Sequence, residues 1–176
     1  MADINKVNER MKDNIYMKSI LDESEYSFKN ITFTLNRKPE SYARERKGRG
    51  KHFYNPKSSI MEECRKSLIK QMNKEDYDFT REIINDVNRD YTIELDIIYY
   101  LPIPKATSIA DTIRMIHGII IPATRPDLDN YNKFLLDVLH EVVYDDDKRV
   151  VASKEMKRYS TEPRTEFTVT IRYKVK

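Results

Sequence analysis

The chain has 176 residues, enough to form one domain with a hydrophobic core of its own. Hydrophobic residues make up 39% and charged residues 35% of the chain, a balance that excludes an intrinsically disordered protein. No apolar run approaches the roughly 18 residues of a membrane span, and no apolar signal-peptide core stands at the start, so we expect no membrane association. The single cysteine, Cys64, excludes an internal disulfide framework and fits a reducing cytoplasm, while the net charge of +3 is too small to indicate nucleic-acid binding by itself.

The first elements predicted along the chain are a helix and a strand. Scattered apolar residues over residues 3 to about 22 predict the helix, so we expect residues 1–26 to form a helical extension of a domain that covers residues 27–176. In "SFKNITFTL", Ile31, Phe33 and Leu35 alternate with other residues, the pattern of a half-buried strand.

A basic loop follows this strand. Seven cations, against two acids, lie between Arg37 and Lys51, together with two of the chain's three glycines. Such a loop can follow a phosphate backbone, although a solvated surface loop has the same composition. The cations expected to contact a polyanion are Arg44, Arg46, Lys47, Arg49 and Lys51. Three aromatic residues beside them could stack on bases or pack in a turn: Tyr42, Phe53 and Tyr54.

The middle of the chain predicts a helix, a long strand and a short helix. After a turn at Asn55-Pro56, either Ser58 or Ser59 could cap a helix over "IMEECRKSLIKQM". In "YTIELDIIYYLPIP" every second residue from Ile93 to Leu101 is apolar, so a half-buried strand is predicted there, and its two prolines end it. Residues 105–124 predict a short helix to about His117 and then a brief apolar stretch.

Two strands are predicted at the end of the chain. They cover "RVVASKEMKRYS" and "EFTVTIRYKV", and the second has apolar residues at every other position from Phe167 onward. The elements together predict a single α+β domain, with a mixed or antiparallel sheet of about four strands and helices packed on one face.

An amphipathic helix is predicted before these two strands, from residue 128 to about 142. Its apolar positions recur at the spacing of a helix that docks on a core: Tyr131, Phe134, Leu135, Val138, Leu139 and Val142. The opposite face carries Asp129, Lys133, Asp137 and Glu141 in steps of four.

Aspartates stand at both ends of this helix, Asp127 and Asp129 at its start and Asp145–Asp147 after its end. Each group alone has an ordinary explanation, because an aspartate caps a helix N-terminus and an acidic turn often precedes a strand. Together they indicate a metal site if they converge, since clustered carboxylates repel one another without a cation. A helix of about 14 residues is roughly 21 Å long. We therefore expect the chain to double back through a strand that starts near Arg149, beside the strand that leads into Asp127.

Carboxylate oxygens favour Mg²⁺ or Mn²⁺ at such a site. An EF-hand is a poor alternative, because Asn132 stands where its glycine is required and Val138 where its glutamate is required. Histidine and cysteine do not cluster here, which argues against zinc. Lys133, one turn from Asp129, could neutralise phosphate oxygens or form an ordinary ion pair on the helix surface.

The segment "RPDLDNYNKFLLDVL", followed by "YDDDKRV", resembles the RusA family of Holliday-junction resolvases, of the phage and Gram-positive type. The hallmark of that family is a K/R-P-D-x-D-N segment, a helix with a lysine and an aspartate, and paired aspartates ahead of a strand. "RERKGRGKHFYNPKS" and "KRYSTEPRTEFTVTI" are similar to its basic loop and C-terminal hairpin, so the resemblance covers residues 28–175. It implies a homodimeric endonuclease that cuts four-way DNA junctions with Mg²⁺ or Mn²⁺ in DNA recombination and repair.

The resemblance also implies roles for individual residues. The catalytic set would be Asp127, Asp129, Lys133 and Asp147. The metal ligands would be Asp127, Asp129, Asp147 and Asp146, although the extra Asp145 lets the register of the pair slip by one. Asn130 and Asp137 would hold these ligands in position without binding the metal themselves. The DNA contacts of the C-terminal hairpin would be Lys154, Lys157 and Arg158.

Two alternatives stay open. The same chemistry would serve a nuclease that acts on flaps or other branched DNA, since branch selectivity depends on dimer spacing. A non-catalytic DNA-binding replication-accessory protein could use the aspartates as helix caps, but the intact acidic set argues against it. A nucleotidyltransferase would need a phosphate-cradling glycine element, and only Gly118 lies outside the basic loop.

Overall fold

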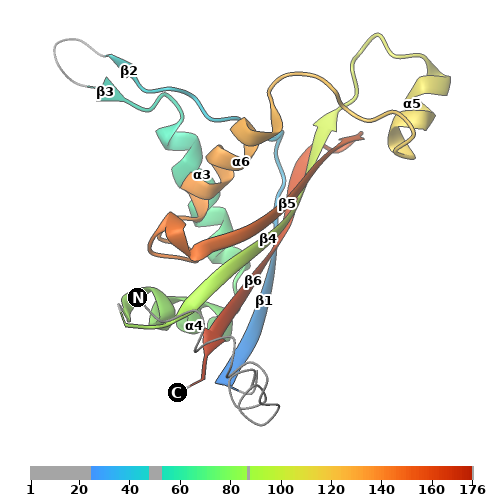
Figure 1. Ribbon diagram of the computed structural model, residues 1–176. Helices are drawn as coiled ribbons and strands as arrows, with labels where there is room; N and C mark the ends of the chain where they lie inside the picture. The colour runs from blue at the N-terminus through green and yellow to red at the C-terminus, as the bar shows by residue number, and fades with distance from the viewer. Residues whose placement is uncertain (1–24, 48–52, 87, 176) are drawn as a thin grey trace, which may run out of the picture.

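A four-stranded mixed sheet forms the centre of the protein (Figure 1). The computed structural model describes residues 25–47, 53–86 and 88–175. The sheet consists of β1 (Tyr26–Leu35), β4 (Tyr91–Pro102), β5 (Val150–Ser160) and β6 (Arg164–Lys174), in the order β1-β6-β4-β5. β6 pairs antiparallel with β1 and with β4, whereas β5 pairs parallel with β4. The predicted α+β fold with a mixed sheet is confirmed.

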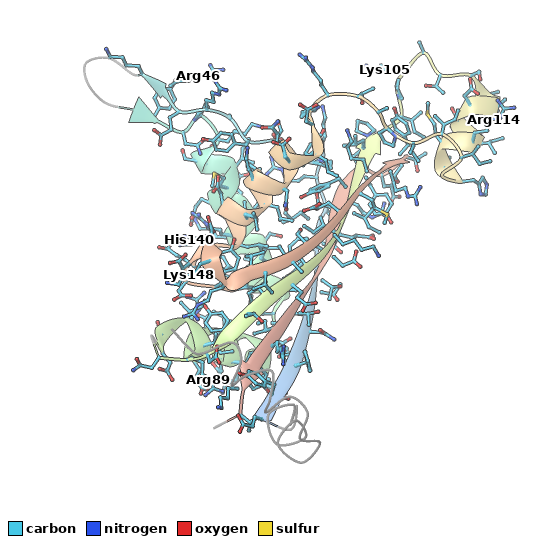
Figure 2. All side chains as sticks on the ribbon, in the orientation of Figure 1. Arg46, Arg89, Lys105, Arg114, His140 and Lys148 are labelled. Carbon is cyan, nitrogen blue, oxygen red and sulfur yellow. The ribbon has the colours of Figure 1, made fainter. Side chains whose placement is uncertain are left out.

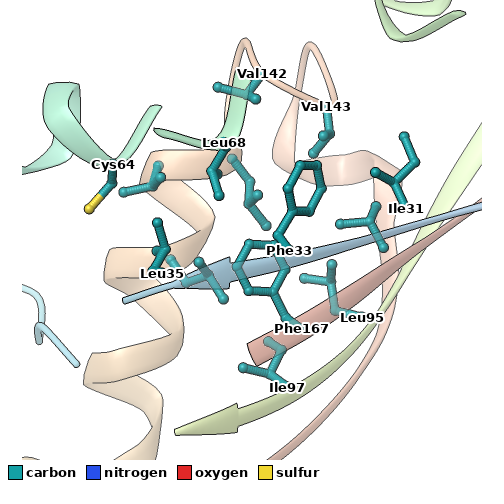
Figure 3. Close-up of a cluster of buried hydrophobic side chains, with 14 of the residues drawn as sticks. Ile31, Phe33, Leu35, Cys64, Leu68, Leu95, Ile97, Val142, Val143 and Phe167 are labelled. Atoms are coloured by element: carbon teal, nitrogen blue, oxygen red, sulfur yellow. The ribbon is translucent and has the colours of Figure 1, made fainter. Parts of the chain in front are cut away.

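The hydrophobic core lies on one face of this sheet. The predicted alternating residues of β1 and β4 are buried there, as are those of β6 from Phe167 to Ile171, whereas Val175 lies beyond β6 and is exposed. Phe33 stacks on Phe167 with ring centroids 5.3 Å apart (Figure 3). The helices α3 (Ser58–Gln71), α4 (Lys74–Asn85) and α6 (Leu128–Leu139) lie on this side of the sheet. The opposite face is open, and Phe28 on it is 60% exposed.

The predicted apolar stripe of α6 is confirmed. Five of its residues, Tyr131, Phe134, Leu135, Val138 and Leu139, are buried on the helix, and the sixth, Val142, is buried in the turn that follows it. The helix ends at Leu139, earlier than predicted, and Glu141 adopts a positive φ of 64° in the turn that follows. Glu141 therefore does not continue the polar face of the helix.

The starts of α3 and α4 were not predicted correctly from the sequence. Neither Ser58 nor Ser59 caps α3, because both serines lie inside its first turn and Lys57 occupies the N-cap position. The helix α4 was not predicted, although its N-cap carries a readable signal. Asn73 Oδ1 accepts a 2.8 Å hydrogen bond from the backbone N–H of Asp76, the usual task of an asparagine ahead of a helix.

Two arms project from the body on either side of α6 (Figure 1). One is the hairpin of β2 (Arg46–Lys47) and β3 (Phe53–Tyr54), within the predicted basic loop. The other carries α5 (Ile109–Ile116), the short helix predicted before His117. The predicted N-terminal extension over residues 1–26 lies outside the described residues, apart from its last two. In the described part of the chain, no helix combines the length and apolarity needed to cross a membrane.

Candidate active site

The first acidic group, Asp127 and Asp129, lies at the N-terminal end of α6. Asp127 occupies the N-cap position, yet its exposed carboxylate makes no capping hydrogen bond to the helix. Asp129 is exposed in the first turn, where its Oδ2 lies 3.3 Å from Lys133 Nζ and its Oδ1 3.4 Å from Asn130 Nδ2. Helix capping therefore does not occupy the Asp127 side chain, and a cation and an amide adjoin Asp129.

The second acidic group lies at the C-terminal end of α6 and consists of Asp137 in the last turn of the helix and Asp145–Asp147 in the chain that follows it. These four residues line an open cavity of about 510 Å³ together with Asn55, Met61, Arg65 and His140. Figure 2 shows His140 and Lys148 at this end of α6, away from Arg46 on the hairpin. The sequence did not predict Arg65 or His140 here. Arg65 belongs to α3 and donates a 2.6 Å hydrogen bond to the Asp137 backbone carbonyl. The two residues are 72 positions apart, so a local sequence pattern could not predict this contact.

Within the second group, Asp145 has a structural role. Its Oδ1 accepts hydrogen bonds from Tyr91 Oη at 2.5 Å and from Arg149 Nε at 3.0 Å. Burial alone would raise the pKa of Asp145, but the bonds from Arg149 and Tyr91 outweigh it and hold the pKa below its ordinary value. Burial, and then the bond to Asp145, raises the pKa of Tyr91 to about 12. These contacts favour Asp146 and Asp147 as the functional pair.

Asp146 and Asp147 are more accessible. Asp146 accepts hydrogen bonds at 3.0 Å from the backbone N–H and the Nζ of Lys148, and the backbone bond in particular lowers its pKa. Asp147 is exposed. Burial, and then the negative charge of Asp147, raises the pKa of Asp137. A carboxyl whose ionisation is opposed by a neighbouring carboxylate favours a nearby cation.

The two acidic groups do not converge within one chain, contrary to the expectation. The helix between them has 12 residues and is about 18 Å long. The cause is the direction of β5. It pairs parallel with β4, with Val150 opposite Ile93 at the start of β4, so α6 returns the chain to the end of the sheet where β4 began. Within the described residues, no group of three or more His, Cys, Asp or Glu side chains could hold a metal ion.

Lys133 and Asp137 lie one turn apart on α6 but have different neighbours. Lys133 pairs with Asp129, one turn toward the helix N-terminus, whereas Asp137 lines the cavity of the second group. Asp137 makes no ion pair with Lys133 in the described part of the chain, and its support of the metal ligands stays a prediction. Asn130 Nδ2 does adjoin Asp129, at 3.4 Å.

Three of the predicted DNA-binding residues of the basic loop are exposed cations on or near the β2–β3 hairpin: Arg44, Arg46 and Lys47. Arg49 and Lys51 lie outside the described residues. Tyr42 and Tyr54 are 38% and 46% exposed, which leaves their rings accessible to a partner.

The three predicted cations of β5 lie on two different faces of the sheet. Lys154 pairs with Asp96 at 3.6 Å on the open face, and the Arg158 guanidinium lies beside Gly118, where a Cβ would come within 3.0 Å of its Nη1. Lys157 lies opposite Tyr99, on the face that the helices cover. These residues therefore do not form one continuous basic surface.

Comparison with known proteins agrees with this arrangement of motifs. The family model of the endodeoxyribonuclease RusA matches residues 36–170, a range that includes the basic hairpin and both acidic groups. The chain belongs to the RusA family. It is also similar to the uncharacterized protein YqaN of Bacillus subtilis (strain 168), with 38% identity over 79 residues, which are 44% of this chain and 56% of that protein. The chain thus spans about half the length of the curated relative it matches. The suspected RusA membership is confirmed.

Proposed function

We propose that this protein is a metal-dependent endodeoxyribonuclease that resolves Holliday junctions by paired phosphodiester cleavage in DNA recombination and repair. The observation that carries this proposal is the RusA family match, which includes both acidic groups. The Asp127 carboxylate supports it, because it is exposed and makes no capping hydrogen bond to the helix, which leaves it available to a ligand. The ion pair of Asp129 with Lys133 supports it as well, because it places a cation beside the first acidic group.

The proposed active form is a homodimer with composite sites. A single chain holds its acidic groups at opposite ends of α6, too far apart to share an ion. A second copy, related by a two-fold axis and with its own α6 antiparallel, would bring each first acidic group next to the second acidic group of the other copy. Two-fold symmetry then creates two identical sites. Two sites suit a four-way junction, in which two opposed strands must be cut.

The donor set fits Mg²⁺ or Mn²⁺, because it consists of exposed carboxylate oxygens. In the proposed dimer, Asp127 and Asp129 of one copy and Asp147 of the other would hold the ion, with Asp146 beside them. Such an ion supplies a water of lowered pKa and stabilises charge on the phosphate. Lys133, beside Asp129, would neutralise phosphate oxygens. Asn130 and Asp137 would orient the ligands without binding the ion themselves.

The hairpin arm provides the proposed DNA contact. Arg44, Arg46 and Lys47 are exposed there, with Tyr42 and Tyr54 close to them in the chain, so cations could follow the phosphates while rings stack on unpaired bases. Arg49 and Lys51 extend the same loop and are proposed as further contacts. The arm projects on the side of α6 opposite the α5 arm, and Asp129 and Lys133 of α6 are exposed.

Cleavage of a labelled four-way junction tests the proposal, beside the matching linear duplex and a flap. Each substrate is incubated with Mg²⁺, with Mn²⁺ and with EDTA, for the wild type, Asp129→Asn and the matched control Asp96→Asn. Asp96 suits the control because it is an exposed aspartate on the open face of the sheet, where it forms an ion pair with Lys154. We expect paired, metal-dependent nicks in the junction, lost in Asp129→Asn and kept in Asp96→Asn.

Other outcomes point to the alternatives. Equal cutting of flaps and junctions would keep the metal site and replace the substrate by branched DNA in general. A junction that is bound but stays whole with either ion would refute catalysis, and a non-catalytic DNA-binding protein would take its place.

A further inference from the structure

The turn that carries Asp127 and Asp129 is tied to β5 by two side chains. Lys157 Nζ donates hydrogen bonds to the backbone carbonyls of Thr124, at 2.8 Å, and Pro126, at 3.3 Å. Glu155, two residues earlier on the same face of β5, accepts a 2.6 Å hydrogen bond from Asn132 Nδ2 in α6. The two side chains thus hold the chain directly before Asp127 and three residues after Asp129.

The register of the sheet explains why these side chains reach α6. Lys157 lies opposite Tyr99 on β4, and Glu155 lies opposite Ile97, both on the covered face. The buried Tyr99 ring stacks on Tyr131 of α6 with centroids 5.2 Å apart. Strand and helix are therefore in direct contact at this point, and side chains from β5 meet the first turns of α6 from one side.

Lys157 is poorly placed to bind DNA in this arrangement. Two of its three N–H donors are directed at carbonyls of its own chain, and the side chain is only partly exposed on the helix face. Lys154, three residues earlier, lies on the other face and is 72% exposed. A cation that contacts phosphates needs donors that point toward solvent.

We propose that Lys157, with Glu155 beside it, positions Asp127 and Asp129 and does not contact DNA. β5 thereby acts as an anchor for the first acidic group, and the anchor fixes where one half of each composite site lies. The consequence for cleavage rests on the proposed function, whereas the anchoring itself does not. In a nuclease, a loosened acidic turn lowers the rate of cleavage after the junction is bound and leaves the binding step unchanged.

Hydrogen exchange measures the anchoring without DNA or metal. We compare the wild type, Lys157→Met and Lys154→Met, the last a matched control that loses a lysine from the other face of the same strand. In Lys157→Met, the amides of the first turns of α6, from Asn130 to Lys133, are expected to exchange about tenfold faster, because loss of the two hydrogen bonds favours local opening. Lys154→Met should exchange like the wild type. Glu155→Gln, which keeps an acceptor for Asn132, should also stay close to the wild type, whereas Glu155→Met should not.

The salt dependence of junction binding in EDTA tests the other half of the claim. Loss of one phosphate contact lowers the slope of log affinity against log salt by about 1, as expected for Arg46→Ala, whereas Lys157→Met should keep the wild-type slope. Unchanged exchange in Lys157→Met, or a slope lowered by about 1 in that variant, would overturn the proposal. If the wild type neither binds nor cuts the junction, the proposed function fails, and the exchange experiment still decides whether Lys157 is an anchor.

Discussion

Replacing Asp145 by asparagine should destabilise the protein strongly, although Asp145 belongs to the same run of aspartates as Asp146 and Asp147. Its carboxylate is 29% exposed and accepts bonds from Tyr91 and from Arg149, whose own side chain is 16% exposed. The Arg149 guanidinium also lies 4.3 Å from the Tyr91 ring centroid. Hydrogen bonds to charged groups contribute roughly 1.5–3 kcal/mol each, and asparagine keeps one acceptor while it removes the charge. We expect the free energy of unfolding to fall by about 2–3 kcal/mol, after allowance for partial exposure of the pair.

Urea denaturation at fixed protein concentration measures this change. With a slope of roughly 2 kcal/mol per molar urea, the midpoint of Asp145→Asn should fall by about 1–1.5 M. Asp146→Asn is the matched control. Its side chain is 47% exposed and bonds to Lys148, which is itself exposed, so its midpoint should stay at the wild-type value. Equal midpoints for the two variants would refute the assignment of a structural role to Asp145.

The pH dependence of the same experiment has a definite sign. The pKa of Asp145 in the folded protein is below its ordinary value of 3.8, so the folded state favours the charged carboxylate. The stability that it contributes is present above pH 3.8 and is lost as the pH falls through the lowered pKa. The difference between the wild type and Asp145→Asn should therefore be full at neutral pH and shrink in strong acid.

Three further predictions concern the core, a helix cap and the hairpin arm. Phe33→Ala should cost about 3–5 kcal/mol of unfolding free energy in urea denaturation, because Phe33 is 1% exposed and loses its stack on Phe167. Asn73→Ala should cost about 1 kcal/mol in the same measurement, since it frees the backbone N–H of Asp76, and Asn73→Asp, which retains a side-chain acceptor, should restore most of the loss. Arg46→Ala should weaken junction binding in a titration by fluorescence anisotropy and leave urea stability unchanged, because its side chain is exposed.

The core strands and the main helix could be predicted from the sequence because each buries one face, which leaves a periodic pattern of apolar residues. Ile31, Phe33 and Leu35 alternate across β1, and the stripe from Tyr131 to Val138 repeats at the helical period; both patterns are consistent only with one buried face. The helix α4 was missed because few of its residues are apolar and only Thr80 and Ile83 are buried. Its asparagine cap was the signal that remained.

The periodicities could not show whether the two acidic groups meet. A helix between two parallel strands returns the chain to the end of the sheet where the first strand began, so residues before and after α6 fall at opposite ends of β4. Periodicity gives no strand direction, and the prediction assumed the direction that closes the site. The inward placement of Lys157 was missed for a related reason: the bulge in the pairing between Ile93 and Glu94 shifts which residues of β5 share a face.

The central claim is that two copies of the chain complete each active site. Mixing two inactive variants tests it most directly: Asp129→Asn alters the first acidic group, and Asp147→Asn alters the second. If the sites are composite, a mixed dimer has one site with both substitutions and one site with neither. After subunit exchange, we predict that nicking of a labelled junction returns to about one quarter of the wild-type level, because half of the dimers are mixed and each has one intact site of two. If each site lies within one chain, both sites of every dimer stay defective, and the mixture remains as inactive as its components.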